Sequence, residues 1–344
     1  MTRKQLLIST GLIAIVAIVL LVVPDQEQKT YHSNKGYVFG TYYSIQYEHA
    51  RDLQDSIERV LAEFDGSMSM FNPQSTLSRI NAGTDSVADE YFLQMYRTAE
   101  EVNSLSDGAF DITVAPLVNL WGFGLKNREH VMPEQVESLL PHIGMQKVRL
   151  RVTGDGLPII EKIDPCVLID AGAIAKGQSC DVLAALLQRN GCVNYLVEIG
   201  GEVVAKGVNS KSQPWRIGVT RPIEDSSGTV SEVQTVLETT DMALATSGNY
   251  RNFYYEGEQK RSHTIDPRTG YPVQHSLLSA TVRSNSCMRA DALATACMVL
   301  GEQEALKMIE KDTLSACYLI VADAVTGSDS VSLRTVSSSR WRED

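Results

Sequence analysis

Residues 288–301 read MRADALATACMVLG, a stretch in which a helical pattern carries two side chains capable of chemistry. Small and apolar residues fill most positions, which predicts a helix over residues 289–300 and a second helical stretch over 302–311. Asp291 and Thr295 stand at positions i and i+4, on one helix face. Their carboxylate and hydroxyl are hard oxygen ligands that suit Mg²⁺. Taken alone, the pair also fits an ordinary helix, with Asp291 as cap and Thr295 bonded back to the backbone.

The segment LIDAGAIAKG, residues 168–177, predicts a strand that delivers Asp170 to a loop of small residues. A helix over 176–190 follows, with Lys176 at its start. Backbone groups in such a loop can approach phosphate or metal closely, and Lys176 could add a positive charge. A tight strand-to-helix turn with a surface lysine is the alternative. The segment is not a Walker loop, because the G-x-x-x-x-G-K-[ST] spacing is absent.

Three further segments are dense in glycine or polar residues: EIGGE (198–202), TSGNYR (246–251) and SHTIDPRTGYP (262–272). Paired glycines within an apolar strand pattern indicate a bulge or a ligand close to the backbone. TSGNYR is expected to form a polar turn after a strand. His263 is a candidate for proton transfer at neutral pH. Singly, each segment also fits a plain loop.

Two aromatic segments complete the candidate site: MSMFNPQS (68–75) and GAFDITVAPLVNLWGFG (108–124). Phe71 could stack on a flat ring, and Asp111 could bond a ring edge or a metal-bound water. Core packing is the alternative for Phe71 and Trp121.

The rest of the chain predicts strands and helices without a regular βαβ period, which favours one α+β catalytic unit. Strands are expected at 38–47, 193–205, 215–219, 230–237, 242–245, 317–321 and 331–336, and helices at 53–64 (ended by Gly66), 88–105 and 133–140.

The N-terminal segment 1–24 is expected to be a signal anchor. Its uncharged run from Leu6 to Val23 would reach roughly 27 Å as a helix, close to the thickness of a bilayer core. Arg3 and Lys4 before the run predict a cytoplasmic N-terminus, with the rest on the periplasmic side of the inner membrane. A cleaved signal peptide and a buried soluble helix are alternatives. Residues 25–36 are expected to form a polar tether, and 37–340 the catalytic domain.

Composition excludes other classes. The 344 residues carry a net charge of −11, which disfavours nucleic-acid binding. The six cysteines form no C-x-x-C pair and have no histidine at metal spacing, so the sequence predicts no structural zinc site. Most of the cysteines are expected to be buried thiols, and one disulfide is left possible.

Read in order, GAFDITVAPLVNLWGFG, IDAGAIAKG, EIGGE, ATSGNYR, SHTIDPRTGYP and ADALATA resemble the FAD:protein FMN transferase family, called ApbE. The resemblance runs from about Val38 to Gly301. It implies an α+β fold with mixed sheets and flanking helices, FAD as substrate and Mg²⁺ as cofactor. It further implies transfer of FMN to a Ser or Thr of an acceptor protein through a phosphoester, with release of AMP. Such acceptors carry a D-G-x-T-G-A-[ST]-like motif and are typically subunits of membrane redox complexes.

The resemblance also implies roles for individual residues. Asp291, Thr295 and the carbonyl of Ala173 would be metal ligands, and His263 would be the base. The flavin- and phosphate-contacting positions would be Phe71, Ala109, Phe110, Asp111, Asp170, Lys176 and Ile265. The chain departs from the family at Ala171, often Leu or Met, at Ala294, sometimes Asp, and in lacking a lipid-acceptor cysteine. An FAD pyrophosphatase that yields FMN and AMP, and a non-catalytic flavin-binding protein on the membrane, are the competing functions.

Overall fold

The computed structural model of the chain describes residues 30–124, 130–222, 232–250, 253–256, 259–323 and 332–342. The predicted signal anchor and residues 25–29 of the predicted tether lie outside these ranges. Within the ranges, no helix combines the length and the apolar character needed to cross a membrane.

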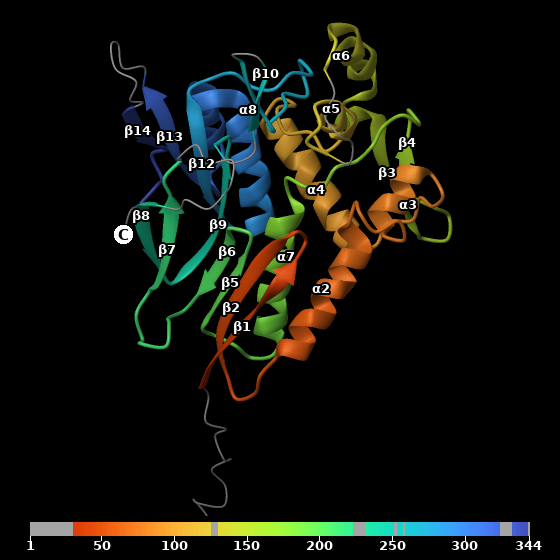
Figure 1. Cartoon of the computed structure of the whole chain (residues 1–344). Coiled ribbons are helices and arrows are strands. Elements are labelled where there is room, and N and C mark those ends of the chain that lie inside the picture. Colours follow the sequence, from red (N-terminus) through yellow and green to blue (C-terminus); the bar gives the residue numbers. More distant parts are fainter. Residues whose placement is uncertain are drawn as a thin grey trace, which may run out of the picture.

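The centre of the fold is a single antiparallel sheet with strand order β1-β2-β5-β6-β9-β12-β13-β14 (Figure 1). The strands are β1 (Thr30–Val38), β2 (Thr41–His49), β5 (Tyr195–Ile199), β6 (Glu202–Lys206), β9 (Asp241–Gly248), β12 (Leu277–Ser284), β13 (Ala316–Asp323) and β14 (Ser332–Ser337). Together with the helices, this sheet confirms the α+β expectation.

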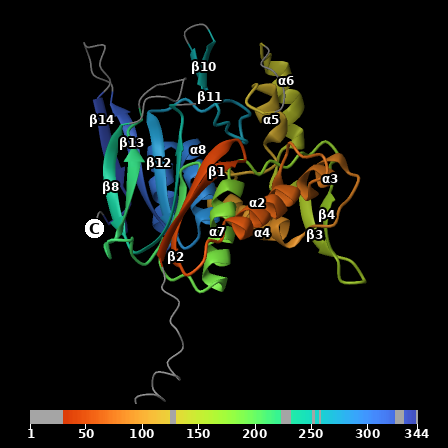
Figure 2. The ribbon, with the colours of Figure 1, turned by 60° about the horizontal axis from the view of Figure 1, so that its bottom comes forward.

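Helices cover one face of the sheet, and a hairpin covers part of the other (Figures 1 and 2). On the helical face, α7 (Ala175–Arg189) and α8 (Cys287–Lys311) pack against the strands, with α2 (Gln54–Met68) and α4 (Glu90–Leu105) outside them. On the opposite face, β7 (Trp215–Thr220) and β8 (Val233–Thr239) bury Trp215 and Leu237 against β6, β9 and β13. The sheet therefore has apolar residues on both faces.

Shorter elements lie beside this core. They are α3 (Thr76–Ala82), α5 (Ala115–Leu120), α6 (Pro133–Leu139), the 3₁₀ turns η1 (Leu140–His142) and η2 (Met145–Lys147), and the hairpins β3–β4 (Val148–Val152, Pro158–Lys162) and β10–β11 (Phe253–Glu256, Gln259–Ser262). A separate apolar cluster that includes Leu117, Trp121 and Ile265 joins α5 and α6 to the segment after β11.

The prediction of a tether over residues 25–36 is wrong for its second half. Residues 30–36 belong to β1, which pairs with β2 along its whole length. The strand has no clear apolar alternation because it is the edge strand of the sheet and only one of its residues, Asn34, is buried. The expected strand 38–47 begins instead at a turn, in which Phe39 and Gly40 both have positive φ (52° and 75°).

Two other boundaries also differ from prediction. Gly66 does not end its helix, since α2 continues to Met68. TSGNYR is not simply a turn, because Thr246–Gly248 continue β9 and pair with β12. The two helical stretches after residue 288 are confirmed as one element, α8, interrupted at Gly301 with a positive φ of 73°.

Candidate functional site

A cleft of about 520 Å³ is lined by all of the residues that the sequence places in the site. They come from loops and helix starts far apart in the chain: Phe71, Ala109, Phe110, Asp111, Asp170, Ala173, Lys176, His263, Ile265, Asp291 and Thr295. The structure therefore brings the predicted site together in one place.

Asp291 lies in the first turns of α8, with only 2% of its surface exposed. The backbone N–H of Gly177 on α7 donates to its Oδ2 at 3.0 Å. A Cβ at position 177 would lie 2.3 Å from the carbonyl oxygen of Cys287 and 2.8 Å from Cβ of Asp291. Glycine is thus required for the approach of α7 to α8 that places Lys176 beside Asp291.

Two side chains, Asp181 and Ser286, fix the start of α8. Asp181 on α7 accepts hydrogen bonds from the backbone N–H groups of Cys287 (2.9 Å) and Met288 (2.8 Å). Ser286 accepts from the N–H of Arg289 at 3.2 Å. These contacts satisfy N–H groups that have no partner within the helix.

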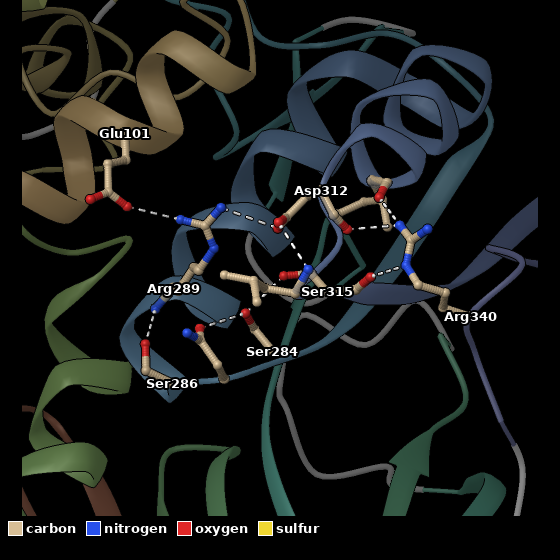
Figure 3. A network of polar contacts seen from close by, with 10 residues as sticks. Glu101, Ser284, Ser286, Arg289, Asp312, Ser315 and Arg340 are labelled. Atoms are coloured by element: carbon tan, nitrogen blue, oxygen red, sulfur yellow. Dashed lines mark hydrogen bonds and ion pairs between the residues drawn. The ribbon is translucent and has the colours of Figure 1, made fainter.

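Arg289 joins this helix start to two other parts of the fold (Figure 3). Its guanidinium donates to Glu101 on α4 at 3.1 Å and to Asp312, just beyond the end of α8, at 3.2 Å. Arg340 also donates to the backbone carbonyl of Asp312 at 2.7 Å. The network holds α8 in place while Asp291 faces the cleft.

A lysine and two carboxylates form the charged part of the cleft. Nζ of Lys176 donates to Oε1 of Glu202 at 2.5 Å and lies 4.0 Å from Oδ1 of Asp291. Burial would lower the pKa of Lys176, but Asp291 and Glu202 outweigh that effect and raise it, so the side chain is an ammonium at neutral pH. Lys176 can therefore attract phosphate but cannot act as a base there.

Glu202 has an unusual environment. It is 2% exposed, and its Oε2 has no hydrogen-bond partner among the residues that the structure describes. Burial, reinforced by Asp291, raises its pKa to about 7 despite the opposing charge of Lys176. The preceding Gly200 and Gly201 have positive φ (62° and 102°) and form the β5–β6 turn that brings Glu202 to Lys176.

Two aspartates predicted to contact the ligand hold loops in place. The carboxylate of Asp111 accepts from the N–H and hydroxyl of Thr113 (2.8 and 2.6 Å), the N–H of Met145 (3.0 Å) and the amide of Asn103 (3.4 Å). Oδ1 of Asp170 accepts from the N–H of Gly172 at 2.7 Å. Burial raises the pKa of both carboxyl groups.

His263 reaches the cleft from the segment after β11, and its ring is T-shaped to that of Phe123, with the centroids 6.3 Å apart. Within this segment Ile265 is buried and pairs with Pro272. The indole of Trp121 donates to the carbonyl of Gly270 at 2.8 Å, which anchors the segment to α5. The role of His263 as a base stays a prediction.

The structure excludes core packing for Phe71 and confirms it for Trp121. Phe71 is 79% exposed at the cleft, so its ring face is available to a planar ligand. Trp121 is 2% exposed and belongs to the apolar cluster of α5 and α6.

The donor set fits a hard divalent cation. Asp291, Thr295 and Ala173 line the same cleft, and Oγ1 of Thr295 lies 3.3 Å from the hydroxyl of Ser247. The buried Oε2 of Glu202, which has no hydrogen-bond partner in the described part of the chain, adds a further oxygen to the lining of this cleft. Oxygen donors of this kind suit Mg²⁺. Because the pKa of Glu202 is about 7, Asp291 and a partly ionised Glu202 together outweigh the charge of Lys176 by less than one unit at neutral pH, which still favours a cation.

The sequence analysis missed Glu202 and Ser247 as site residues. Both lie within segments it singled out, EIGGE and TSGNYR. For Glu202, the signal in the sequence was a carboxylate directly after a pair of glycines. Its partner Lys176 becomes visible only in the structure, where α7 packs on β6.

The fold and the cleft define an α+β enzyme with a charged pocket beside an exposed aromatic ring. The ApbE family model matches residues 39–319, and the chain belongs to this family. It is 37% identical to the FAD:protein FMN transferase of Vibrio cholerae, over 91% of this chain and 94% of that protein. It is 36% identical to the enzyme of the same name from Haemophilus influenzae, over 91% and 92%.

Solved structures agree with this assignment. The flavin transferase ApbE from Vibrio cholerae superposes with a TM-score of 0.77 at 36% identity, covering 91% of this chain and 98% of that one. The apo form of the Pseudomonas stutzeri flavinyl transferase ApbE gives 0.77 at 29% identity, covering 92% and 96%. The resemblance deduced from the sequence is confirmed, and the chain is a transferase of this family.

Proposed function

We propose that this enzyme transfers FMN from FAD to a Ser or Thr hydroxyl of an acceptor protein in a Mg²⁺-dependent reaction. The observation that carries the proposal is the meeting of all the predicted site residues in one cleft. The names of its relatives, FAD:protein FMN transferases, support the same reaction.

In the proposed reaction the acceptor oxygen forms a bond to the FMN phosphorus, and the bond from that phosphorus to the bridging oxygen of the pyrophosphate breaks. AMP leaves with the bridging oxygen, and the hydroxyl proton passes to a base, for which His263 is the candidate. Lys176 binds the phosphates by charge, and its pairing with Glu202 fixes the direction of its ammonium. Phe71 offers its exposed ring to a flat ring of FAD.

Asp291, Thr295 and the carbonyl of Ala173 would hold Mg²⁺. When bound, Mg²⁺ neutralises phosphate charge and makes AMP a better leaving group. Gly177 and Asp181 keep the Asp291 carboxylate in position before substrate arrives.

The acceptor is proposed to carry a D-G-x-T-G-A-[ST]-like motif, as in subunits of membrane redox complexes. The enzyme itself is proposed to be anchored in the inner membrane by residues 1–24, with its catalytic domain on the periplasmic side. The apolar run from Leu6 to Val23 and the preceding positive charges support this location.

The test is incubation with FAD, Mg²⁺ and a D-G-x-T-G-A-T peptide, followed by mass spectrometry. The expected product is a peptide heavier by FMN less water, together with AMP, and both depend on Asp291 and Thr295. Free FMN with unlabelled peptide would show hydrolysis instead of transfer. Unchanged FAD after long incubation would show a non-catalytic flavin-binding protein.

A further inference from the structure

A second group of metal-ligating side chains lies outside the residues that line the cleft. His142 ends η1, and Asp164 and Cys166 stand in the turn after β4. One donor atom from each of the three lies within 4.8 Å of the others. Nδ1 of His142 lies 2.6 Å from Oδ2 of Asp164, and Oδ1 of Asp164 accepts from the N–H of Cys166 at 2.9 Å.

We propose that His142, Asp164 and Cys166 form a binding site for a divalent transition-metal ion of the zinc class. Imidazole nitrogen, carboxylate oxygen and thiolate sulfur are the ligands that Zn²⁺ accepts in tetrahedral sites. Cys166 is exposed and the other two are partly buried, so a water molecule can supply the fourth ligand. The donor atoms of the cleft are all oxygen and therefore select a harder cation than these three side chains do.

The charges around the group are consistent with this ion. Two positive side chains face it, because Lys147 and Lys162 both interact electrostatically with Asp164. Zinc-class ions bind cysteine as the thiolate, so Cys166 would release its proton when the ion binds. The thiolate of Cys166 and the carboxylate of Asp164 would together neutralise the two positive charges of the bound ion. The two lysines would then lie beside a neutral complex.

The sequence alone gave no sign of this site, because His142 is remote in sequence from Cys166. The backbone brings them together: the N–H of Ile163 donates to the carbonyl of Lys147 at 2.8 Å, which fixes the turn after β4 beside the segment that follows η1.

The position of the group gives the ion a structural consequence. Shortly after His142, the N–H groups of Gly144 and Met145 donate to Thr113 (2.7 Å) and Asp111 (3.0 Å). After Cys166 the chain leads to Asp170, whose N–H donates to the carbonyl of Ile112 at 2.6 Å. An ion bound by both His142 and Cys166 would therefore restrain the two loops that carry Asp111 and Asp170 into the cleft.

The test titrates the metal-free full-length protein with Co²⁺ under reducing conditions, with Mg²⁺ in excess to occupy the cleft. The expected result is one Co²⁺ per chain, with a thiolate-to-cobalt charge-transfer band in the near ultraviolet. The other five cysteines, Cys180, Cys192, Cys287, Cys297 and Cys317, are all buried, so the band reports on Cys166. Added Zn²⁺ should displace the bound Co²⁺ and so remove the charge-transfer band.

Cys166→Ser should abolish the band, and His142→Gln and Asp164→Asn should weaken Co²⁺ binding. The matched control is His130→Gln, because Nδ1 of His130 makes a similar contact with Oε1 of Glu256 at 2.9 Å. This control should leave the titration unchanged. A far-ultraviolet circular dichroism spectrum that matches the wild type would show that the Cys166→Ser variant is folded.

Three results would overturn the proposal: Co²⁺ bound without the band, a band that persists in Cys166→Ser, or equal loss of binding in His130→Gln. As a second readout, Zn²⁺ should raise the melting temperature of the wild type but not of Cys166→Ser. Equal shifts in the two proteins would also contradict the site.

Discussion

The backbone N–H of Gly177 donates a hydrogen bond of 3.0 Å to the carboxylate of Asp291. This single contact joins the segment IDAGAIAKG to the segment ADALATA, and it forms where α7 and α8 meet. The absence of a side chain at position 177 is what allows it, since a Cβ there would press on the backbone of Cys287.

Gly177→Ala is therefore expected to destabilise the protein and to reduce transfer. The added methyl group forces a buried helix contact apart, which costs about 1–3 kcal/mol. Chemical denaturation measures the change, and the activity assay shows whether Asp291 is displaced.

The control is Gly66→Ala in α2, where a Cβ meets nothing within 4 Å. This change should stabilise the helix by about 0.5–1 kcal/mol, because alanine is the better helix former. Equal destabilisation by both variants would contradict the steric argument for Gly177.

Asp181 should make stability depend on pH. Burial raises its pKa to about 6, against the opposing bonds from Met288 and Cys287, whereas the unfolded value is about 3.9. The folded state then binds the proton more tightly, so the contribution of Asp181 to stability falls as pH rises from about 4 to about 6.

Unfolding free energies of wild type and Asp181→Asn, measured across pH 4–7, check this. The wild type should lose on the order of 2 kcal/mol relative to the variant over that range. A pH-independent difference would mean that Asp181 titrates normally in the folded protein.

The interaction of Lys176 with Glu202 can be tested by a double-mutant cycle. Lys176→Met leaves Glu202 buried without its cation. The free energy of unfolding should fall by on the order of 1–3 kcal/mol, a range set low because one-third of the lysine side chain is exposed to solvent. Adding Glu202→Gln should restore most of that stability but not activity, since the positive charge for phosphate is still missing. Simple additivity of the two stability changes would show that the side chains are not coupled.

How much of the candidate site the sequence could predict depended on whether its residues are close together in the chain. Asp291 and Thr295 are a local pair on one helix, so their common face follows from helix geometry alone. Glu202 and Lys176 meet only through the packing of α7 on β6, which no local pattern records. The same holds for His142 and Cys166.

Strands were missed where burial does not alternate. β12 is buried on both sides of the sheet, and β1 is an exposed edge strand, so neither shows the period of two that marks a half-buried strand. β1 is held in the sheet by its antiparallel pairing with β2, and the polar sequence of β1 gives no sign of that pairing.

The proposed role of Thr295 as a metal ligand predicts a clear difference between two small changes. Thr295→Val keeps the shape but removes the oxygen, whereas Thr295→Ser keeps the oxygen. A metal ion contributes several kcal/mol to such a reaction, so at limiting Mg²⁺ the valine variant should transfer FMN at least about 100-fold more slowly. The serine variant should stay close to wild type.

Ser247→Ala tests whether the slower transfer comes from lost metal binding or from the lost hydrogen bond between the hydroxyls of Ser247 and Thr295, which lie 3.3 Å apart. It removes that partner and leaves the Thr295 oxygen in place, so its dependence on Mg²⁺ concentration should resemble that of the wild type. If Ser247→Ala and Thr295→Val lowered the rate equally, and excess Mg²⁺ rescued neither, the hydroxyl of Thr295 would be a structural group and not a ligand.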